Sequence, residues 1–350
     1  MTNGFPERSS ITQNRAFASA SVRLDGIVDV LILLGLSGSW LGLLGHWHWF
    51  LDIFSHFRWQ YLLVCVLAVV WSLGRKRRLV AWISGLTLLL NAVMIGSLLV
   101  SLQKPSGTAL PDFNLRLVSL NILTENRRHQ EVLDYLRQVD ADIIFLMEID
   151  EVWAKAMEPL KQTHPHHLEH VREDNFGLAL YSRLPLKTAE VLHRFEHGLN
   201  LNPYTPPTIE ARVLIGAREV VLYGIHTLPP GGGLQWRSRN WLLEDIGRQA
   251  AALPEPVLVF GDLNATPWCE GMRSLLRGGR LGFCMPNPSW APTWRVTSAF
   301  AIPIDHALCT PPLVILNRQI GPDLGSDHRA QVLEIRWMDG AASYDAGTAH

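Results

Sequence analysis

The chain has 350 residues and a formal net charge of −1, a length that allows one large domain or two ordinary ones. Charge is unevenly distributed: residues 1–102 hold eight Lys/Arg and four Asp/Glu, whereas residues 103–350 hold 23 and 28. Four cysteines without metal-ligand spacing exclude a disulfide framework, although one Cys269–Cys284 bridge stays open in an oxidising compartment.

Three apolar stretches fill the first hundred residues: Ile27–Gly45, Trp59–Leu73 and Leu79–Leu102. A helix needs ~20 apolar residues to cross the hydrocarbon core of a bilayer. The first and third stretches meet this length, and Phe57 and Trp59 extend the second through the interface. We therefore predict an N-terminal tail (1–26) and a membrane region (27–102) with three transmembrane helices.

The orientation of these helices follows from the positive-inside rule. A basic turn, Arg75–Arg78, separates the second and third stretches, and the N-terminal tail is also basic, so both are expected in the cytoplasm. The chain is then predicted to be a multi-pass protein of the cell (inner) membrane, with residues from 103 onward outside the cytoplasm. Two spans plus a buried hairpin, with the domain inside, is the alternative.

The remaining chain reads as a linker (103–114), an α/β domain (115–337) and a C-terminal tail (338–350). Apolar alternation after Leu115 and the short apolar run Ile143–Met147 predict strands, and the spacing around Val132–Val139 predicts a helix between them. The same analysis predicts strands over Val220–Ile225, Val257–Phe260, Ile302–Leu308 and Ala330–Ile335, and a helix over Trp236–Leu253.

Polar side chains recur where these predicted strands end. A carboxylate, amide or imidazole in that position is held by rigid backbone and faces a cleft. Several acidic oxygens at one edge repel each other without a cation, and Mg²⁺ or Mn²⁺ prefers such ligands and suits phosphoester hydrolysis. The residues are Asn121, Glu148, His226, Asp262, Asn264, Asp305, Asp327 and His328.

Over about residues 115–337 the chain resembles the endonuclease/exonuclease/phosphatase (DNase I-like) superfamily. The resemblance lies in short motifs that occur in the family's order: Ser119-Leu120-Asn121, Leu146-Met147-Glu148, Gly224-Ile225-His226-Thr227, Gly261-Asp262-Leu263-Asn264, Ile304-Asp305-His306 and Ser326-Asp327-His328. It implies an α/β fold of two packed mixed β-sheets flanked by helices, here preceded by three transmembrane helices. Thr293-Trp294 and the N-terminal spans resemble the membrane-anchored branch of VanJ-type proteins.

The resemblance also implies a metal site. Glu148 would be the main carboxylate ligand of Mg²⁺ (or Mn²⁺), with Asn121 beside it and Asp327 as a further ligand or as a ligand of a second metal ion. Many nuclease members carry an acidic residue two positions after the first Asn, where this chain has Leu123. That departure bears on the nuclease subtype rather than on the chemistry.

Five further residues take catalytic roles by the same resemblance. Asp262 would orient or deprotonate the attacking water, assisted by Asn264. His328, held in its tautomer by Asp305, would contact phosphoryl oxygens or transfer a proton. His226 would stabilise charge or protonate the leaving oxygen.

Each motif has a simpler interpretation when taken alone. Gly-Asp-x-Asn is more often a turn than a site, Asp327-His328 suits a surface loop, and Glu148 suits a solvated strand end. A second histidine cluster, His164–His170, contains Pro165 and is interpreted as an exposed loop outside the site.

The predicted function is therefore a membrane-anchored phosphatase or phosphodiesterase acting on a lipid-linked or envelope phosphate. The expected partners are the lipid bilayer and a phosphorylated lipid or small molecule, and no protein partner is implied. A membrane-tethered nuclease is the first alternative, disfavoured because the domain is acidic and has no Lys/Arg-rich run. A non-catalytic binding protein on the same fold is the second.

Overall fold

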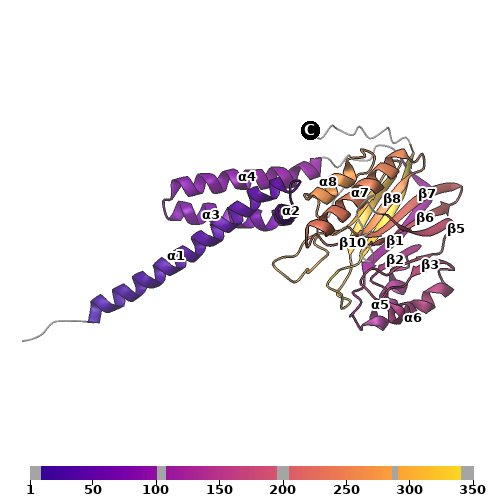
Figure 1. Ribbon diagram of the computed structural model, residues 1–350, viewed down its shortest axis with the longest axis horizontal. Coiled ribbons are helices and arrows are strands. Elements are labelled where there is room, and N and C mark those ends of the chain that lie inside the picture. The colour runs from indigo at the N-terminus through magenta and orange to yellow at the C-terminus, as the bar shows by residue number, and fades with distance from the viewer. Residues whose placement is uncertain (1–8, 101–107, 195–204, 286–290, 340–350) are drawn as a thin grey trace, which may run out of the picture.

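A computed structural model describes residues 9–100, 108–194, 205–285 and 291–339. The expected fold is confirmed: two mixed β-sheets pack face to face with helices outside them, and the N-terminal helices project from one end of this domain (Figure 1). Residues 1–8 of the predicted N-terminal tail, 103–107 of the predicted linker and 340–350 of the predicted C-terminal tail lie outside the described residues.

The first sheet has six strands in the order β10-β11-β1-β2-β4-β3. Its central pair, β1 and β2, is parallel, and the other neighbours are antiparallel. Its strands are β1 (Thr108–Asn121), β2 (Ile143–Met147), β3 (His166–His170), β4 (Leu178–Ser182), β10 (Leu313–Ile320) and β11 (Gln331–Asp339).

The second sheet has five strands in the order β5-β6-β7-β8-β9. Here β7 and β8 form the parallel pair. The strands are β5 (Leu186–His193), β6 (Pro207–Ile215), β7 (Arg218–His226), β8 (Val257–Asp262) and β9 (Asp305–Cys309). Each sheet therefore contains one parallel pair whose carboxyl ends lie at the same edge.

Alternation along the strands builds the core in layers. In β1, Leu115 and Leu117 join the core between the sheets, whereas Val118 and Leu120 join the core under the outer helices. Successive side chains of a strand point to opposite faces, so one short segment supplies both layers.

Helices cover the two outer faces. The first sheet carries α5 (His129–Val139), α6 (Glu151–Met157) and η2 (Glu158–Gln162), and the second carries α7 (Gly233–Ala252) and α8 (Glu270–Leu276). Asp150 caps α6, because its side chain accepts a hydrogen bond from the Trp153 amide at 2.7 Å.

The N-terminal region contains α1 (Ser9–Leu41), η1 (Gly42–Leu44), α2 (Trp49–Ser55), α3 (Arg58–Gly74) and α4 (Arg78–Val100). By length and composition, two segments are able to cross a membrane, Asp25–Leu44 and Arg78–Ser97. The bent pair α2 and α3, at 65° to each other, makes a third if it counts as one span. Within the described residues there are thus two or three candidate spans where the sequence predicted three.

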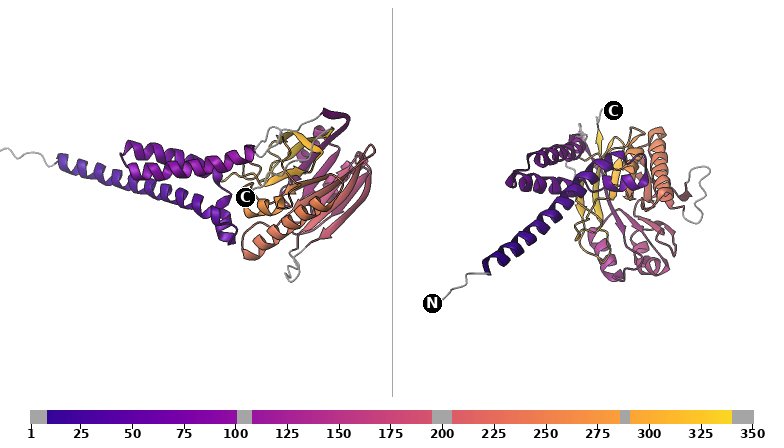
Figure 2. Two further views of the ribbon diagram at one scale, coloured as in Figure 1. Left: turned by 90° about the horizontal axis from the view of Figure 1, so that it is seen from above. Right: turned by 60° about the vertical axis from the view of Figure 1, so that its left-hand side comes forward.

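The two ends of this helical region differ. At the turn between α3 and α4, which lies at the end of these two helices away from the sheets, Arg75 pairs with Asp25 of α1 and Arg77 with Asp29. At the near end, α2 packs beside α7 (Figure 2). The basic turn and the sheet domain therefore lie at opposite ends of the helices.

Some boundaries and interpretations differ from the sequence-based ones. Strand β1 begins at Thr108, before the predicted start at Leu115, and the predicted tail is helical from Ser9. His164 is buried, with Nε2 3.0 Å from the Ala141 carbonyl, and the following histidines lie in β3, so the interpretation as an exposed loop is wrong. All four cysteines are free, so the Cys269–Cys284 bridge does not form.

Candidate active site

The site lies where the two parallel strand pairs end. In the first sheet, Asn121 at the end of β1 pairs in register with Met147, the last residue of β2, and Glu148 follows. In the second sheet, His226 pairs with Asp262, which in turn pairs with Asp305 on β9. Register alone therefore brings three polar side chains together across adjacent strands.

The backbone at these strand ends is unusual. Glu148 and Asn264 adopt left-handed conformations, with φ of 67° and 45°. Gly261 has φ of 129°, and a Cβ there would lie 2.0 Å from the Ile225 carbonyl oxygen, so only glycine fits. Non-glycine residues at positive φ cost of order 1–3 kcal/mol and cluster at functional sites.

Asn121 and Glu148 form the first part of the site. The Asn121 amide donates to Glu148 Oε1 at 2.8 Å, and the Thr124 amide donates to Glu148 Oε2 at 3.2 Å. The Asn121 carbonyl of the main chain accepts from the Ser326 hydroxyl at 2.8 Å. These contacts tie the ends of β1 and β2 to the loop that carries Asp327 and His328.

Asp262 is the centre of the second part and is 1% exposed. Its Oδ1 accepts from the Asn264 amide at 2.9 Å. Its Oδ2 lies 3.5 Å from His226 Nε2, 3.6 Å from His328 Nε2 and 3.5 Å from the Asn121 amide nitrogen. One carboxylate oxygen is thus fixed by backbone, while the other faces three potential donors.

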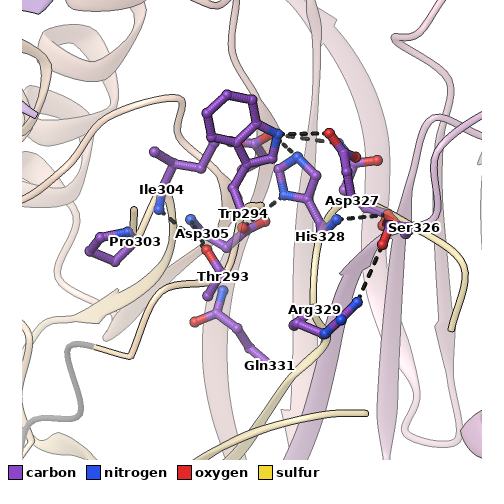
Figure 3. A network of polar contacts seen from close by, with 12 residues as sticks. Thr293, Trp294, Pro303, Ile304, Asp305, Ser326, Asp327, His328, Arg329 and Gln331 are labelled. Atoms are coloured by element: carbon purple, nitrogen blue, oxygen red, sulfur yellow. Dashed lines mark hydrogen bonds and ion pairs between the residues drawn. The ribbon is translucent and has the colours of Figure 1, made fainter. Parts of the chain in front are cut away.

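Contacts with Asp305 and Ser326 fix the position of His328. Its Nδ1 lies 2.9 Å from Asp305 Oδ2, and its backbone amide donates to the Ser326 hydroxyl at 3.0 Å (Figure 3). The Asp305 amide donates to the Thr293 hydroxyl at 3.1 Å. This arrangement places Nδ1 of His328 on Asp305 and leaves Nε2 toward Asp262.

Charge on the two histidines differs sharply. Burial lowers the pKa of His226 to about 3, which keeps this imidazole neutral. Burial also acts to lower the pKa of His328, but the carboxylates of Asp305 and Asp262 raise it to about 10, which keeps this ring cationic. Burial acts to raise the pKa of Asp305, and the His328 charge overcomes this and holds it below 3.8.

Two carboxylates hold their protons more tightly than usual. Burial raises the pKa of Asp262 to about 8, and burial raises the pKa of Glu148 despite the hydrogen bond from Asn121. Buried carboxylates of this kind become stable anions when a cation is nearby. The donor set of Glu148, Asn121 and Asp327, with Asp262 adjacent, thus fits a hard divalent cation that prefers oxygen ligands.

Not every predicted ligand is in the tightest cluster. Asp262, Asp305 and His328 have ligand atoms within 4.8 Å of one another, and the two predicted carboxylate ligands, Glu148 and Asp327, are not part of that group. Asp327 lines the same pocket as Glu148, and its Oδ2 accepts a hydrogen bond from the Trp294 indole at 2.7 Å (Figure 3). The eight predicted residues therefore meet at one edge, where the Asn121 amide nitrogen, 2.8 Å from Glu148 Oε1 and 3.5 Å from Asp262 Oδ2, connects the metal-ligand candidates with the cluster around Asp262.

Sequence reasoning missed several neighbours of the site. Trp294 orients Asp327 and Thr293 supports Asp305, although the sequence marked Thr293-Trp294 only as a point of resemblance to VanJ-type proteins. Phe176 stacks near His226, with ring centroids 5.0 Å apart, and no sequence signal pointed to it.

Six of the eight predicted site residues line one pocket of about 490 Å³, and Asn121 and Asp305 contact that lining from behind. Its walls are largely apolar around a polar floor, and the described lining residues include no Lys or Arg. They are Leu123, Glu148, Asn175, Phe176, His226, Leu228, Pro229, Leu234, Gln235, Asp262, Asn264, Trp294, Ile304, Asp327 and His328.

Solved structures share this fold at low sequence identity. Truncated TDP2 from Caenorhabditis elegans superposes with a TM-score of 0.53 at 16% identity, over 64% of this chain and 98% of that one. An endonuclease/exonuclease/phosphatase from Beutenbergia cavernae gives 0.53 at 17% identity, over 65% and 72%. TDP2 from D. rerio complexed with a single-strand DNA product gives 0.52 at 14%, over 63% and 98%.

No curated protein matches the chain. A model of the endonuclease/exonuclease/phosphatase family matches residues 113–328, a range that contains all eight predicted site residues. The chain therefore belongs to the Endonuclease/Exonuclease/phosphatase family and is a hydrolase of phosphoester bonds.

Proposed function

We propose that the protein is a membrane-anchored, extracytoplasmic, Mg²⁺- or Mn²⁺-dependent hydrolase of a lipid-linked or envelope phosphoester. One observation carries this proposal: the polar floor formed by Asp262, His226 and His328 lies in a largely apolar pocket, and α7, which supplies part of the pocket wall, contacts α2 of the N-terminal region that also holds the apolar helices long enough to cross a membrane. A substrate with a phosphate head and an apolar tail matches both parts of that surface.

The residues suggest how the phosphate would be hydrolysed. Glu148, Asn121 and Asp327 would hold the cation, which supplies neutralisation of the phosphoryl charge. Asp262, once ionised, accepts a proton from the attacking water. The Asn264 amide holds its Oδ1 in place, and its Oδ2 faces the site. A new bond forms between the water oxygen and phosphorus, and the bond between phosphorus and the leaving oxygen breaks.

The two imidazoles take different parts in this scheme. His328 is cationic and carries the proton available to a phosphoryl or leaving oxygen, and Asp305 keeps Nδ1 occupied so that Nε2 faces the site. His226 is neutral, which favours a hydrogen bond to developing charge over proton donation. Of the two roles that the resemblance allowed for His226, charge stabilisation has the stronger support.

The position of the pocket supports a lipid substrate. Leu234, which lines it, is 47% exposed and lies at the start of α7. A Cβ on the adjacent Gly233 would lie 3.4 Å from the Trp49 ring of α2, so the residue next to this wall contacts the N-terminal helical region. Trp47 and Phe50 beside it are exposed, as side chains at a membrane interface are.

The proposed orientation rests on the ends of the helices. Arg75–Arg78 lies at the end far from the sheets, and basic turns stay in the cytoplasm. With that turn inside, a domain at the opposite end is outside. This layout also resembles that of the VanJ-type branch, to which the sequence is similar.

A membrane-tethered nuclease is the second candidate, because D. rerio TDP2 of the same fold was solved with a DNA product. Nucleic-acid affinity depends mainly on Lys and Arg contacts to phosphates. The described lining of the pocket has neither, and the position where many nuclease members are acidic holds Leu123. Both observations favour the lipid-linked phosphate.

The experiment uses the full chain in detergent micelles with Mg²⁺, Mn²⁺ or EDTA. The panel contains a polyprenyl diphosphate, phosphatidic acid, a water-soluble phosphomonoester and phosphodiester, and single- and double-stranded DNA. An Asp262→Asn variant is the negative control, and Asp323→Asn, an exposed carboxylate on a loop, is the matched control.

Metal-dependent cleavage of a lipid phosphate, lost in Asp262→Asn and kept in Asp323→Asn, is the expected result. Preferential cleavage of DNA would replace the proposal with the nuclease. If the protein binds substrates of the panel but cleaves none of them, the result would favour a non-catalytic binding protein on the same fold.

A further inference from the structure

A buried ion pair joins the N-terminal helical region to the sheet domain. Asp52 of α2 and Arg239 of α7 are both fully buried, with Oδ2 and Nη2 2.5 Å apart. Asp52 also accepts from the Trp236 indole at 3.0 Å and from the Glu270 amide at 2.9 Å. One carboxylate thus binds both helices that cover the second sheet.

Arg239 continues this connection into the site. Its Nη1 donates to the backbone carbonyl of Asn264 at 2.9 Å, and its Nε and Nη2 donate to Asn240 Oδ1 at 2.9 and 2.8 Å. The planar guanidinium group has a fixed fork of donors, so its contact with Asp52 and its contact with Asn264 set each other's geometry.

Asn264 is the residue that orients Asp262. Its amide donates to Asp262 Oδ1, and its side-chain nitrogen donates to the Thr227 carbonyl at 2.8 Å. Its φ of 45° is a conformation that persists only when its surroundings fix it. The Arg239 contact is one of the interactions that do so.

We propose that Asp52 and Arg239 are positioning residues for hydrolysis: a carboxylate from the N-terminal helical region sets Arg239, which holds the Asn264 backbone and through it Asp262. The N-terminal region then contributes to the active site as well as anchoring it. This inference concerns the hydrolase site itself and does not depend on a lipid substrate.

A metal site at the same place is the competing interpretation, because ligand atoms of Asp52, His56 and Cys269 lie within 4.8 Å of one another. Both oxygens of Asp52 already accept hydrogen bonds, from Arg239 and Trp236 on one side and from the Glu270 amide on the other. The guanidinium charge also opposes a cation there, so the ion pair is the better account.

The test compares variants of the full chain in detergent. Arg239→Lys keeps the charge that Asp52 needs, but one ammonium group does not reproduce the fork that reaches Asn264. The double variant Asp52→Asn/Arg239→Gln removes both charges together, which avoids an unpaired buried charge that would prevent folding. Trp268→Phe is the matched control, because it removes another bond between the regions, from the indole to the Met94 carbonyl at 3.2 Å.

Two measurements are made. Hydrogen–deuterium exchange on peptides that cover residues 261–266 reports the Asn264 amide whatever the substrate, and steady-state kinetics on the substrate that the wild type cleaves separates kcat from KM. We expect both ion-pair variants to exchange at least tenfold faster there and to lose about tenfold in kcat at similar KM, because small displacements of a reacting group are costly.

Trp268→Phe should stay within twofold of the wild type in both measurements. Unchanged exchange and kcat in folded ion-pair variants would overturn the proposal. An equal effect of Trp268→Phe would also overturn it, because contacts between the N-terminal helical region and the sheet domain would then act only through the overall stability of the protein.

Discussion

His328 Nδ1 lies 2.9 Å from Asp305 Oδ2, and both side chains are buried beside Asp262. Asp305 comes from β9 in the second sheet, whereas His328 lies just before β11 in the first. The pair therefore joins the two sheets at the edge where both parallel strand pairs end. It links the assembly of the site to the packing of the sheets.

Asp305→Asn should destabilise the protein in a pH-dependent way. The folded pKa of His328 is raised to about 10, so its contribution is complete below about pH 6.5 and is lost as pH rises through 10. The pKa of Asp305 is held below 3.8, so its contribution is lost only in stronger acid. The loss should be about 3 kcal/mol near pH 5–6.

The measurement is thermal unfolding of the detergent-solubilised full chain in EDTA, from pH 5 to pH 10. The difference between wild type and Asp305→Asn should shrink above pH 9. A difference that stays constant over this range would show that the ion pair is not its cause.

Asp262→Asn should lower kcat by about 10²–10⁴-fold, the range for loss of a general acid or base. The amide keeps the shape of the carboxylate but does not accept the water proton. Activity of the detergent-solubilised protein on its preferred substrate checks this, with circular dichroism to verify the fold. Retention of more than a tenth of the wild-type kcat would remove Asp262 from the proposed role.

Local patterns predicted the ends of β1, β2, β7 and β8 well, because each combines a short apolar run with an abrupt polar residue. The prediction was wrong for Asp305, which begins β9 instead of following a strand, and the predicted strand start at Ile302 is three residues too early. The run Ile143–Met147 is β2 with the predicted bounds, and Glu148 follows it as expected. Motif order then predicted that strands far apart in the sequence would meet. Asn121, Glu148, Asp262 and His328 accordingly line one site or contact its lining residues.

Other features depend on tertiary contacts that leave no local signal. Arg239 is a charged residue within the predicted helix Trp236–Leu253, yet it is fully buried because Asp52, 187 positions earlier, neutralises it. His164 looks exposed beside Pro165 but is buried against the Ala141 carbonyl. The start of β1 at Thr108 depends on pairing with the end of β11, which composition near Pro105 and Gly107 conceals.

Glu148→Gln should abolish most stabilisation by Mg²⁺. A ligand that binds only the folded state stabilises it by about 2.7 kcal/mol at a hundred times its Kd. The melting temperature of the wild type should rise on titration with Mg²⁺, and that of Glu148→Gln should not. Glu190→Gln, an exposed carboxylate on β5, should behave as wild type; equal shifts in all three proteins would place the cation elsewhere.

The catalytic domain should lie outside the cytoplasm. Alkaline phosphatase fused after residue 350 should be active and a fluorescent protein fused there should be dark, because each folds on only one side of the membrane. Replacing the four basic residues Arg75–Arg78 with Gln should weaken this bias, since those charges set the orientation. A bright fluorescent fusion to the unaltered chain would contradict the three-span arrangement.

Leu234→Ser should weaken binding of a long-chain substrate without changing the chemistry. Leu234 lines the pocket and is 47% exposed at the start of α7, where an acyl or prenyl chain would cover it. Covering a leucine side chain is worth about 1.5–3 kcal/mol, so KM for a long-chain lipid phosphate should rise about tenfold or more. KM for a short-chain analogue with the same head group should stay within twofold, because that molecule ends before the apolar wall.

Leu316→Ser, at a leucine of similar exposure on β10, is the control for a general effect of surface polarity on detergent-solubilised protein. Equal changes for both chain lengths would mean that Leu234 shapes the polar floor, and the apolar wall would then have no part in choosing the substrate.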